Sequence, residues 1–310
     1  DMDALPIQEI NDDLEYKSTV DGVSHKCGHD GHTTIITGLC ISLHQQPLQK
    51  GKVVVLYQPA EEIGYGANSI LKDEKFNEHV PDWAFALHNL PGYPMHEVVY
   101  RQGIFTPAVK SLIVKLHGRT SHAAEPEKGL NPGLAIADIL QQACELSVTD
   151  LARKDFFLVT PIYTEMGEKA YGTSAGYGEV HLTLRSWHND VMEDKAGQCK
   201  KIAEQVGKHY GIKVETSWTE VFYANKNHPD TVDIIKAAAN RAQLDAEERD
   251  TPFKWGEDFG LFTAKYRGAM FGIGSGVDQP ALHNPDFDYP DELTETGVTM
   301  FRNIIDEILT

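Results

Sequence analysis

Strand-like and helix-like segments alternate along the first part of the chain, and this alternation limits the possible folds more than any other feature. The stretch 33–44 has the apolar spacing of a helix, whereas 52–58 and 82–87 are short apolar runs. Such runs between turn residues are typical of buried strands in a parallel sheet. The sequence therefore predicts an α/β domain with a mostly parallel sheet and helices on both faces.

The pattern changes near residue 107. Strands with one exposed face are expected at 109–117, 176–186 and 212–221. Helices are expected to begin at Asn131-Pro132, as N-cap and N1 residues, and at Asp190, which forms a capping box with Glu193. This order of elements indicates a compact α+β unit at 107–221.

The α/β pattern returns after this unit. Residues 230–243 have helical spacing, 269–274 resemble a strand and 291–309 form a last amphipathic helix. We therefore expect 1–106 and 222–310 to form one discontinuous domain, into which 107–221 is inserted.

Charge and cysteine content exclude several classes of protein. The net charge of −18 argues against nucleic acid or an anionic membrane as partner. No stretch approaches 18 apolar residues, so no membrane span is expected. The four cysteines form no CxxC pair, which favours a cytoplasmic protein without disulfides.

The sequence begins DMDALP without an initiator methionine. We therefore expect a preceding segment, which would carry any targeting signal and would include a further strand. Loss of a strand would expose a sheet edge and could leave this chain less active.

Possible metal ligands are concentrated in HKCGHDGH, residues 25–32. Cys27 and His29 are separated by one glycine, so both side chains can converge on one ion. Thiolate and imidazole ligands suit zinc and its neighbours. The alternative is that these are core residues or helix caps, with Asp30 capping the helix at 33.

Three further stretches strengthen the metal hypothesis. Glu61 and Glu62 follow a predicted strand, so one carboxylate can bind metal while the other moves protons. His88 ends the strand 82–87, and His283 follows the strand 269–274. Strand ends are where open α/β sheets place their ligands. Taken singly, the glutamates could be a solvated acidic turn and the histidines ordinary packing residues.

Eight motifs in order carry a family resemblance: DMDALP, HKCGHDGH, LYQPAEE, ALHNLPG, GRTSHAAEP, LTLRSW, GEDFG and LHNPDFDY. Together they resemble the zinc-carboxypeptidase/aminoacylase metallopeptidases. The most similar subgroup contains hippurate hydrolase, N-acyl-amino-acid amidohydrolases and auxin-conjugate hydrolases. The resemblance implies an enzyme that hydrolyses the amide bond of small N-acyl amino acids.

The resemblance also implies a site for two divalent ions, zinc or manganese. Its ligands would be Cys27, His29, Glu62, His88 and His283. Glu61 would be the general base, and Asp3 would lie beside the ligands. Asp1 stands where other branches carry a ligand histidine, so its role is open.

In the resembling family the inserted unit is a lid and dimerisation domain, which implies a homodimer through 107–221. His122 would then stabilise the oxyanion in the partner's site, and Arg185 would bind the substrate carboxylate. The alternatives are a surface-loop histidine and a strand-surface arginine.

Three other functions compete with this one. Ser174 lies in a G-x-S-x-G stretch, followed by Asp258 and His283, which is the residue order of a serine hydrolase. Residues 271–280 resemble a dinucleotide loop but lack its last glycine. A non-catalytic, metal-binding dimeric module would also carry the ligands. Inhibition by a chelator would distinguish the metalloenzyme from the serine hydrolase.

Overall fold

The chain forms two compact units in the computed structural model, which describes residues 1–309. Unit 1 contains Asp1–Phe105, Asn225–Phe253 and the described chain from Glu257 onward. Unit 2 contains Thr106–Ala224 and the short segment Lys254–Gly256, which the sequence pattern had not separated from its surroundings. Among the described residues, no helix has the length and apolar character needed to cross a bilayer.

Unit 1 is built on a mixed four-stranded sheet in the order β1-β12-β2-β11. β1 (Trp83–Leu90) lies parallel to β12 (Arg267–Gly274), and β2 (Val98–Tyr100) lies parallel to β11 (Ala246–Glu248). β12 and β2 are antiparallel. A separate pair joins β3 (Gly103–Thr106) and β10 (Asn225–Asn227).

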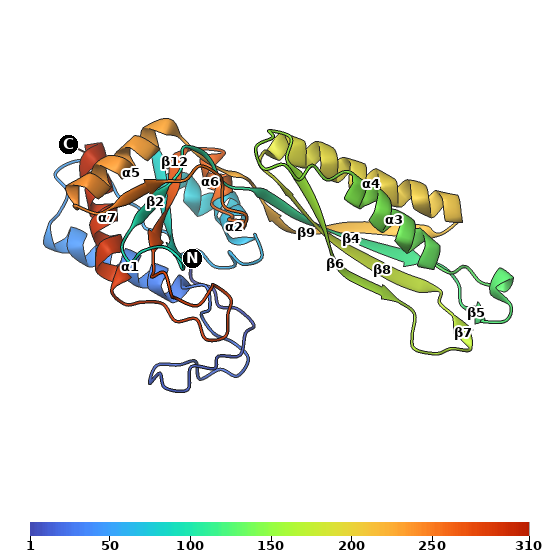
Figure 1. Cartoon of the computed structure of the whole chain (residues 1–310). Coiled ribbons are helices and arrows are strands. Elements are labelled where there is room, and N and C mark those ends of the chain that lie inside the picture. Colours follow the sequence, from blue (N-terminus) through green and yellow to red (C-terminus); the bar gives the residue numbers. More distant parts are fainter. Residues whose placement is uncertain (310) are drawn as a thin grey trace. The chain divides into compact units, whose positions relative to one another are not determined.

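Helices cover both faces of this sheet, as the sequence predicts (Figure 1). One face packs against α1 (His29–Gln45), α5 (Pro229–Arg241) and α7 (Leu293–Leu309). The other face is covered by α2 (Gly66–Lys72), η1 (Glu74–His79) and α6 (Gly260–Thr263). Apolar side chains alternate along β12, and Phe271 and Ile273 join the larger core. Helices on both faces therefore pack against the sheet of unit 1.

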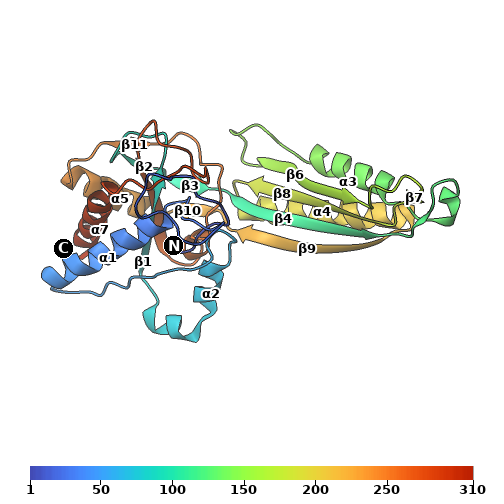
Figure 2. The same ribbon diagram turned by 90° about the horizontal axis from the view of Figure 1, so that it is seen from below.

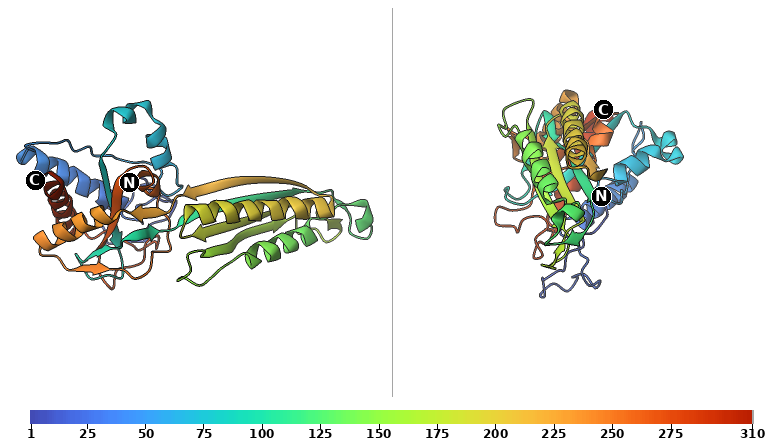
Figure 3. Two further views of the ribbon diagram at one scale, coloured as in Figure 1. Left: turned by 90° about the horizontal axis from the view of Figure 1, so that it is seen from above. Right: turned by 90° about the vertical axis from the view of Figure 1, so that its right-hand side faces the viewer.

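Unit 2 is an antiparallel sheet in the order β6-β8-β4-β9. Its strands are β4 (Ala108–His117), β6 (Phe157–Met166), β8 (Tyr177–Ser186) and β9 (Lys213–Phe222). Figures 2 and 3 show α3 (Gly133–Glu145) and α4 (Asn189–Tyr210) along one face of this sheet. A projecting loop region carries η2 (Pro126–Lys128) and pairs β5 (Ser121–His122) with β7 (Thr173–Ser174).

The predicted strand at 52–58 is wrong. This segment has no strand assignment, and Val54, Leu56 and Tyr57 are each more than a third exposed. A strand requires a neighbour that completes its backbone hydrogen bonds, and an apolar run does not encode that neighbour. The Tyr57 hydroxyl instead lies 2.9 Å from Thr37 Oγ1 of α1.

Two predicted element boundaries shift toward the candidate site. α1 begins at His29 rather than 33, so Asp30 lies exposed in its first turn and is not its cap. β1 continues past His88 to Leu90, so His88 lies within the strand. Both shifts place ligand-type residues on regular backbone.

The predicted caps in unit 2 also differ. Asn131 Oδ1 accepts a 2.8 Å hydrogen bond from Gly133 N–H, but the N-cap residue is Pro132. The capping box of Asp190 and Glu193 does not form, and α4 begins after His188. Glu193 pairs with Lys110 of β4 at 2.5 Å, so a tertiary ion pair replaces the local contact.

Candidate metal centre

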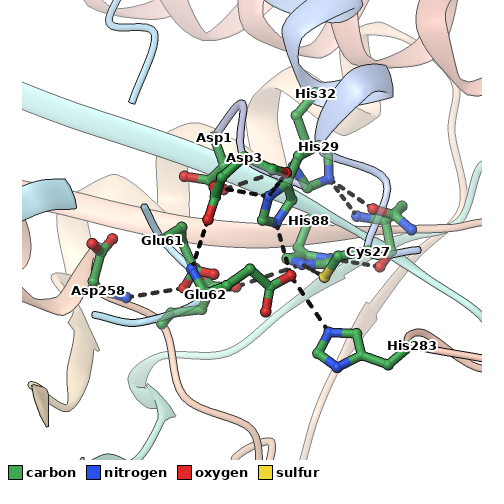
Figure 4. A network of polar contacts seen from close by, with 12 residues as sticks. Asp1, Asp3, Cys27, His29, His32, Glu61, Glu62, His88, Asp258 and His283 are labelled. Carbon is green, nitrogen blue, oxygen red and sulfur yellow. Dashed lines mark hydrogen bonds and ion pairs between the residues drawn. The ribbon is translucent and has the colours of Figure 1, made fainter. Parts of the chain in front are cut away.

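Side chains with metal-ligand chemistry gather at one place in unit 1 (Figure 4). Among the described residues, four overlapping groups bring their ligand atoms within 4.8 Å of one another, and two of these are Asp1, His29 and His32, and His29, Glu61 and Glu62. The other two share Cys27. The first group is Cys27, His29 and His88, and the second is Cys27, Glu62 and His283. The five residues that the sequence proposes as ligands are therefore brought together.

The first group is buried and lies at α1 and β1. His29 and His88 are 0% and 2% exposed, and Cys27 Sγ lies 3.5 Å from His88 Nε2. Gly28 precedes α1 with a φ of 93°, and a Cβ there would lie 2.6 Å from Asn89 Oδ1. Glycine is required at this turn because of both the backbone angle and the close approach of β1.

The second group is carried by loops. Glu62 lies in the turn after 52–60, and His283 lies in the long loop after β12 with a φ of 66°. His283 Nε2 is 3.5 Å from Glu62 Oε1, and His29 Nε2 is 3.9 Å from the same oxygen. The His283 side chain is half exposed, in contrast to the other two histidines.

Backbone and carboxylate contacts orient the buried imidazoles. His29 Nδ1 lies 3.2 Å from Asp3 Oδ1, and Asp3 Oδ2 accepts a 3.0 Å hydrogen bond from Glu62 N–H. Burial raises the pKa of Asp3, but these hydrogen bonds outweigh it and hold the pKa at about 2. His88 Nδ1 lies 2.8 Å from the Asn89 carbonyl, which cannot donate, so Nδ1 carries the proton. Nε2 of His88 is then left with a lone pair toward Cys27.

Glu61 lies beside the ligands and is buried. Burial raises its pKa to about 8, and the nearby charges of Asp258 and Glu62 add to the shift. The Asp258 backbone N–H lies 3.4 Å from Glu61 Oε1 and orients the carboxylate. A carboxylate at this position can accept and return a proton.

The donor set fits divalent cations. His29 Nε2 and Glu62 Oε1 are buried and have no hydrogen-bond partner among the described residues. Buried polar atoms are nearly always paired, so these two atoms fit a cation as their partner. Burial and then the charges of Glu62, Glu61 and Glu257 raise the pKa of Cys27, and bound cations would reverse that effect. The mixed nitrogen, oxygen and sulfur ligands suit zinc and related ions.

The sequence pattern missed several residues of this site. Glu257 is fully buried, and its Oε1 lies 3.5 Å from His88 Nε2. Asp258 accepts hydrogen bonds from Gln58 Nε2 at 2.6 Å and from Ala67 N–H at 2.9 Å. Both acids lie in the GEDFG motif, which supported the family resemblance but received no metal-site role. His32, which lies in HKCGHDGH but was given no role, contacts Asn89 Oδ1 at 2.7 Å through its Nε2.

Two of the proposed site residues belong to unit 2. His122 is exposed in β5, and its Nδ1 accepts a 3.1 Å hydrogen bond from Ala124 N–H. Arg185 is in β8, where its Nε donates to the Lys254 carbonyl at 3.2 Å. Asp3, in contrast, lies beside His29 in the cluster itself.

The structure contradicts the serine-hydrolase and dinucleotide readings. Ser174 ends the two-residue strand β7 and is followed by β8, whereas a nucleophile elbow requires a helix there. Asp258 is already bound by Gln58 and Ala67. After β12 the chain continues as a loop until Leu293, so no helix N-terminus is available to a dinucleotide phosphate at 271–280.

Comparison with known families decides the assignment of the chain. The model for peptidase family M20/M25/M40 matches residues 1–307. The chain belongs to this family. It is therefore a hydrolase, which argues against a non-catalytic metal-binding module.

Individual relatives agree with this placement. An uncharacterized hydrolase of Staphylococcus haemolyticus is 33% identical over 275 residues, covering 87% of this chain and 71% of its own length. The YXEP protein of Bacillus subtilis, described as a dinuclear metal binding peptidase of the M20 family, has a TM-score of 0.80 at 25% identity. That match covers 99% of this chain and 79% of the other.

A more distant M20-like fold occurs in an aminobenzoyl-glutamate utilization protein of Klebsiella pneumoniae. It has a TM-score of 0.71 at 18% identity and covers 93% of this chain and 67% of its own. At this identity the likeness concerns the fold alone.

Proposed function

We propose that this M20-family hydrolase cleaves the amide bond of N-acyl amino acids or small peptide-like conjugates. Its nearest functional relatives would be the hippurate hydrolases and N-acyl-amino-acid amidohydrolases. One observation carries the proposal: two groups of ligand atoms share Cys27, and the buried Glu61 lies beside them. A dinuclear metal binding relative with the same fold supports this interpretation.

Two divalent ions, zinc or manganese, would be held by five side chains, namely Cys27, His29, Glu62, His88 and His283. Such ions lower the pKa of water toward neutrality and polarise a substrate carbonyl. Asp3 holds His29 and the backbone of Glu62 in place, so it fixes ligands from two segments at once.

Glu61 would act as the general base. Its carboxylate would accept the proton of the attacking water and pass it to the leaving nitrogen. Assistance of this kind contributes roughly 10²–10⁴-fold in rate. The hydrogen bond from the Asp258 N–H keeps one carboxylate oxygen of Glu61 oriented.

His122 and Arg185 would contribute from unit 2. Because a backbone N–H donates to His122 Nδ1, the neutral ring carries its proton on Nε2, which suits donation to an oxyanion. Arg185 lines a largely apolar cavity with Phe156 and Trp187, and its Nε donates to the Lys254 carbonyl. A guanidinium in such surroundings suits the free carboxylate of a substrate.

Unit 2 would serve as a lid and as the contact surface of a homodimer, with His122 acting in the partner's site. Mixing inactive His122→Ala and Glu61→Gln chains tests this directly. A shared site regenerates some intact sites in mixed dimers, so activity returns. No recovery on mixing would contradict a site shared between subunits.

Metal content per chain and hydrolysis of a panel of N-acyl amino acids, before and after chelation, test the function as a whole. We expect about two ions per chain, by analogy with the dinuclear relative, and activity that returns when metal is added back. Activity that chelation does not change would contradict the metal mechanism. Reversible metal dependence without cleavage of any N-acyl amino acid would contradict only the substrate class.

A further inference from the structure

Lys26 is a buried cation inside the HKCGHDGH motif, between two residues of ligand type. Its side chain is 1% exposed, yet neither the metal cluster nor the proposed mechanism uses it. Burying an ammonium group is costly unless its protons are all bound. The hydrogen-bond partners of the Lys26 ammonium group therefore show which segments its side chain holds together.

The three ammonium protons of Lys26 bind two separate parts of unit 1. Nζ lies 2.8 Å from Glu9 Oε1 and 3.4 Å from Asn11 Oδ1, both in the N-terminal loop. It also donates to the Phe287 carbonyl at 2.7 Å, in the loop that follows His283. Phe287 is itself fully buried, so this contact is fixed at both ends.

The backbone of Lys26 contacts the same loop. Its carbonyl accepts a 2.7 Å hydrogen bond from His283 N–H. Two further hydrogen bonds join the loops nearby, from Ile10 N–H to the Pro285 carbonyl and from Asn11 Nδ2 to the Asp286 carbonyl. Lys26 thus connects the segment that carries Cys27 to the segment that carries His283.

His283 needs such support more than the other histidines. Its side chain is half exposed, its backbone has a φ of 66°, and its Nε2 lies 3.5 Å from Glu62 Oε1. His29 and His88, in contrast, are held by burial and by regular elements. A loop-borne ligand that is not packed must be oriented through its backbone.

We propose that Lys26 is a positioning residue that holds His283 in place for the second metal group, Cys27, Glu62 and His283. The inference rests on the proposed metal site. It assigns Lys26 no direct contact with metal or substrate. Its loss would therefore weaken one of the two bound ions more than the other.

Lys26→Met in the full chain tests the proposal, because methionine keeps much of the length and removes the charge and the side-chain hydrogen bonds to Glu9 and the Phe287 carbonyl. The backbone hydrogen bond from His283 N–H stays, so the variant isolates the part of the support that the side chain provides. After chelation, stepwise metal titration should show one ion bound with native affinity and the other weakened about 10–100-fold, as is common when a ligand's supporting contact is lost. Added metal should restore both the second ion and the activity. Equal native affinity for both ions would overturn the proposal.

Two variants keep the test decisive. Glu9→Gln removes the charge that pairs with Lys26 but keeps a hydrogen-bond acceptor, so we expect the same selective loss of one ion, at smaller size. If Lys26→Met does not fold, the double variant Lys26→Met/Glu9→Gln replaces it, because the double variant leaves no unpaired carboxylate. Lys17→Met is the matched control, since Lys17 pairs with exposed Asp12 in the same loop, and it should bind both ions normally. If the native chain binds no metal, the site proposal itself is wrong; if native binding is normal and loss is equal at both ions, only the Lys26 role is wrong.

Discussion

The two metal groups that share Cys27 are built in different ways. His29 and His88 are buried on α1 and β1, where helix and sheet geometry fixes their direction. Glu62 and His283 lie on a turn and a loop, and His283 is half exposed. Regular elements place ligands precisely without further help, whereas loop ligands depend on contacts such as those of Lys26. The first group should therefore tolerate disturbance of the loops, and the second should not.

Removing the shared ligand should have the largest effect. Cys27→Ala deletes the thiolate common to both groups, so both groups should lose their ions together. We expect metal affinity to fall by more than about 100-fold, because loss of a mere supporting contact already costs about 10–100-fold. Metal analysis of the purified variant measures this. Cys40→Ala, at an exposed position on α1, is the control. Full retention of one ion by Cys27→Ala would show that the two groups are independent.

Removing the base should separate chemistry from binding. Glu61→Gln keeps the shape of the side chain but cannot accept the proton, so turnover should fall by about 10²–10⁴-fold. Both ions should remain, since the two groups that share Cys27 are complete without Glu61, although Glu61 also lies within ligand distance of His29 and Glu62. Metal analysis and steady-state kinetics on the same sample give the two values. Loss of an ion in this variant would make Glu61 a ligand instead.

Much of the fold can be predicted from the local spacing of apolar residues. The wrong prediction of a strand at 52–58 depended on a contact that local spacing does not encode. Alternation along 109–117 and helical spacing at 291–309 identify β4 and α7, because burial on one face leaves a periodic trace. The run at 52–58 is also apolar, but it has no strand partner among the described residues. An apolar run does not show which segment it will pair with.

The candidate site shows the same limit. Ligand-type residues at predicted strand ends, with the family resemblance, pointed to all five proposed ligands. Glu257 and Lys26 were missed because a charged residue is normally exposed. The burial of Lys26 depends on acceptors distant in the sequence, among them the carbonyl of Phe287, 261 positions away, which accepts a hydrogen bond from its ammonium group. Contacts over that distance appear only once the chain is folded.

His88→Ala and His283→Ala test whether the buried group and the loop-borne group contribute differently to the stability of the metal-free protein. Both variants should lose metal affinity. In the metal-free protein, His88→Ala should lower the free energy of unfolding by about 2–4 kcal/mol, since it leaves a cavity and an unbonded Asn89 carbonyl. His283→Ala, at a half-exposed position, should change it by no more than about 0.5 kcal/mol. Denaturant unfolding with chelator present measures both. Equal losses would mean that the loop-borne group is as much a part of the core as the first.

The smallest expected effect concerns the packing of α1, which carries His29 of the buried group. A Cβ on Gly31 of α1 would lie 2.3–2.4 Å from the ring of Tyr289, which is itself buried. Gly31→Ala should therefore destabilise the metal-free protein by about 1–3 kcal/mol, because the ring or the helix must move. Gly197→Ala is the matched control in helix α4, where nothing lies within 4 Å of the added methyl, and it should stabilise by about 0.5–1 kcal/mol. Thermal unfolding of the two variants, with and without metal, measures the difference in stability.

If α1 is displaced, Gly31→Ala should also weaken binding of the ion held by His29 and His88. Normal binding of that ion in a destabilised variant would show that Tyr289 moves instead, and that α1 keeps its ligands fixed by its contacts with β1 and α7.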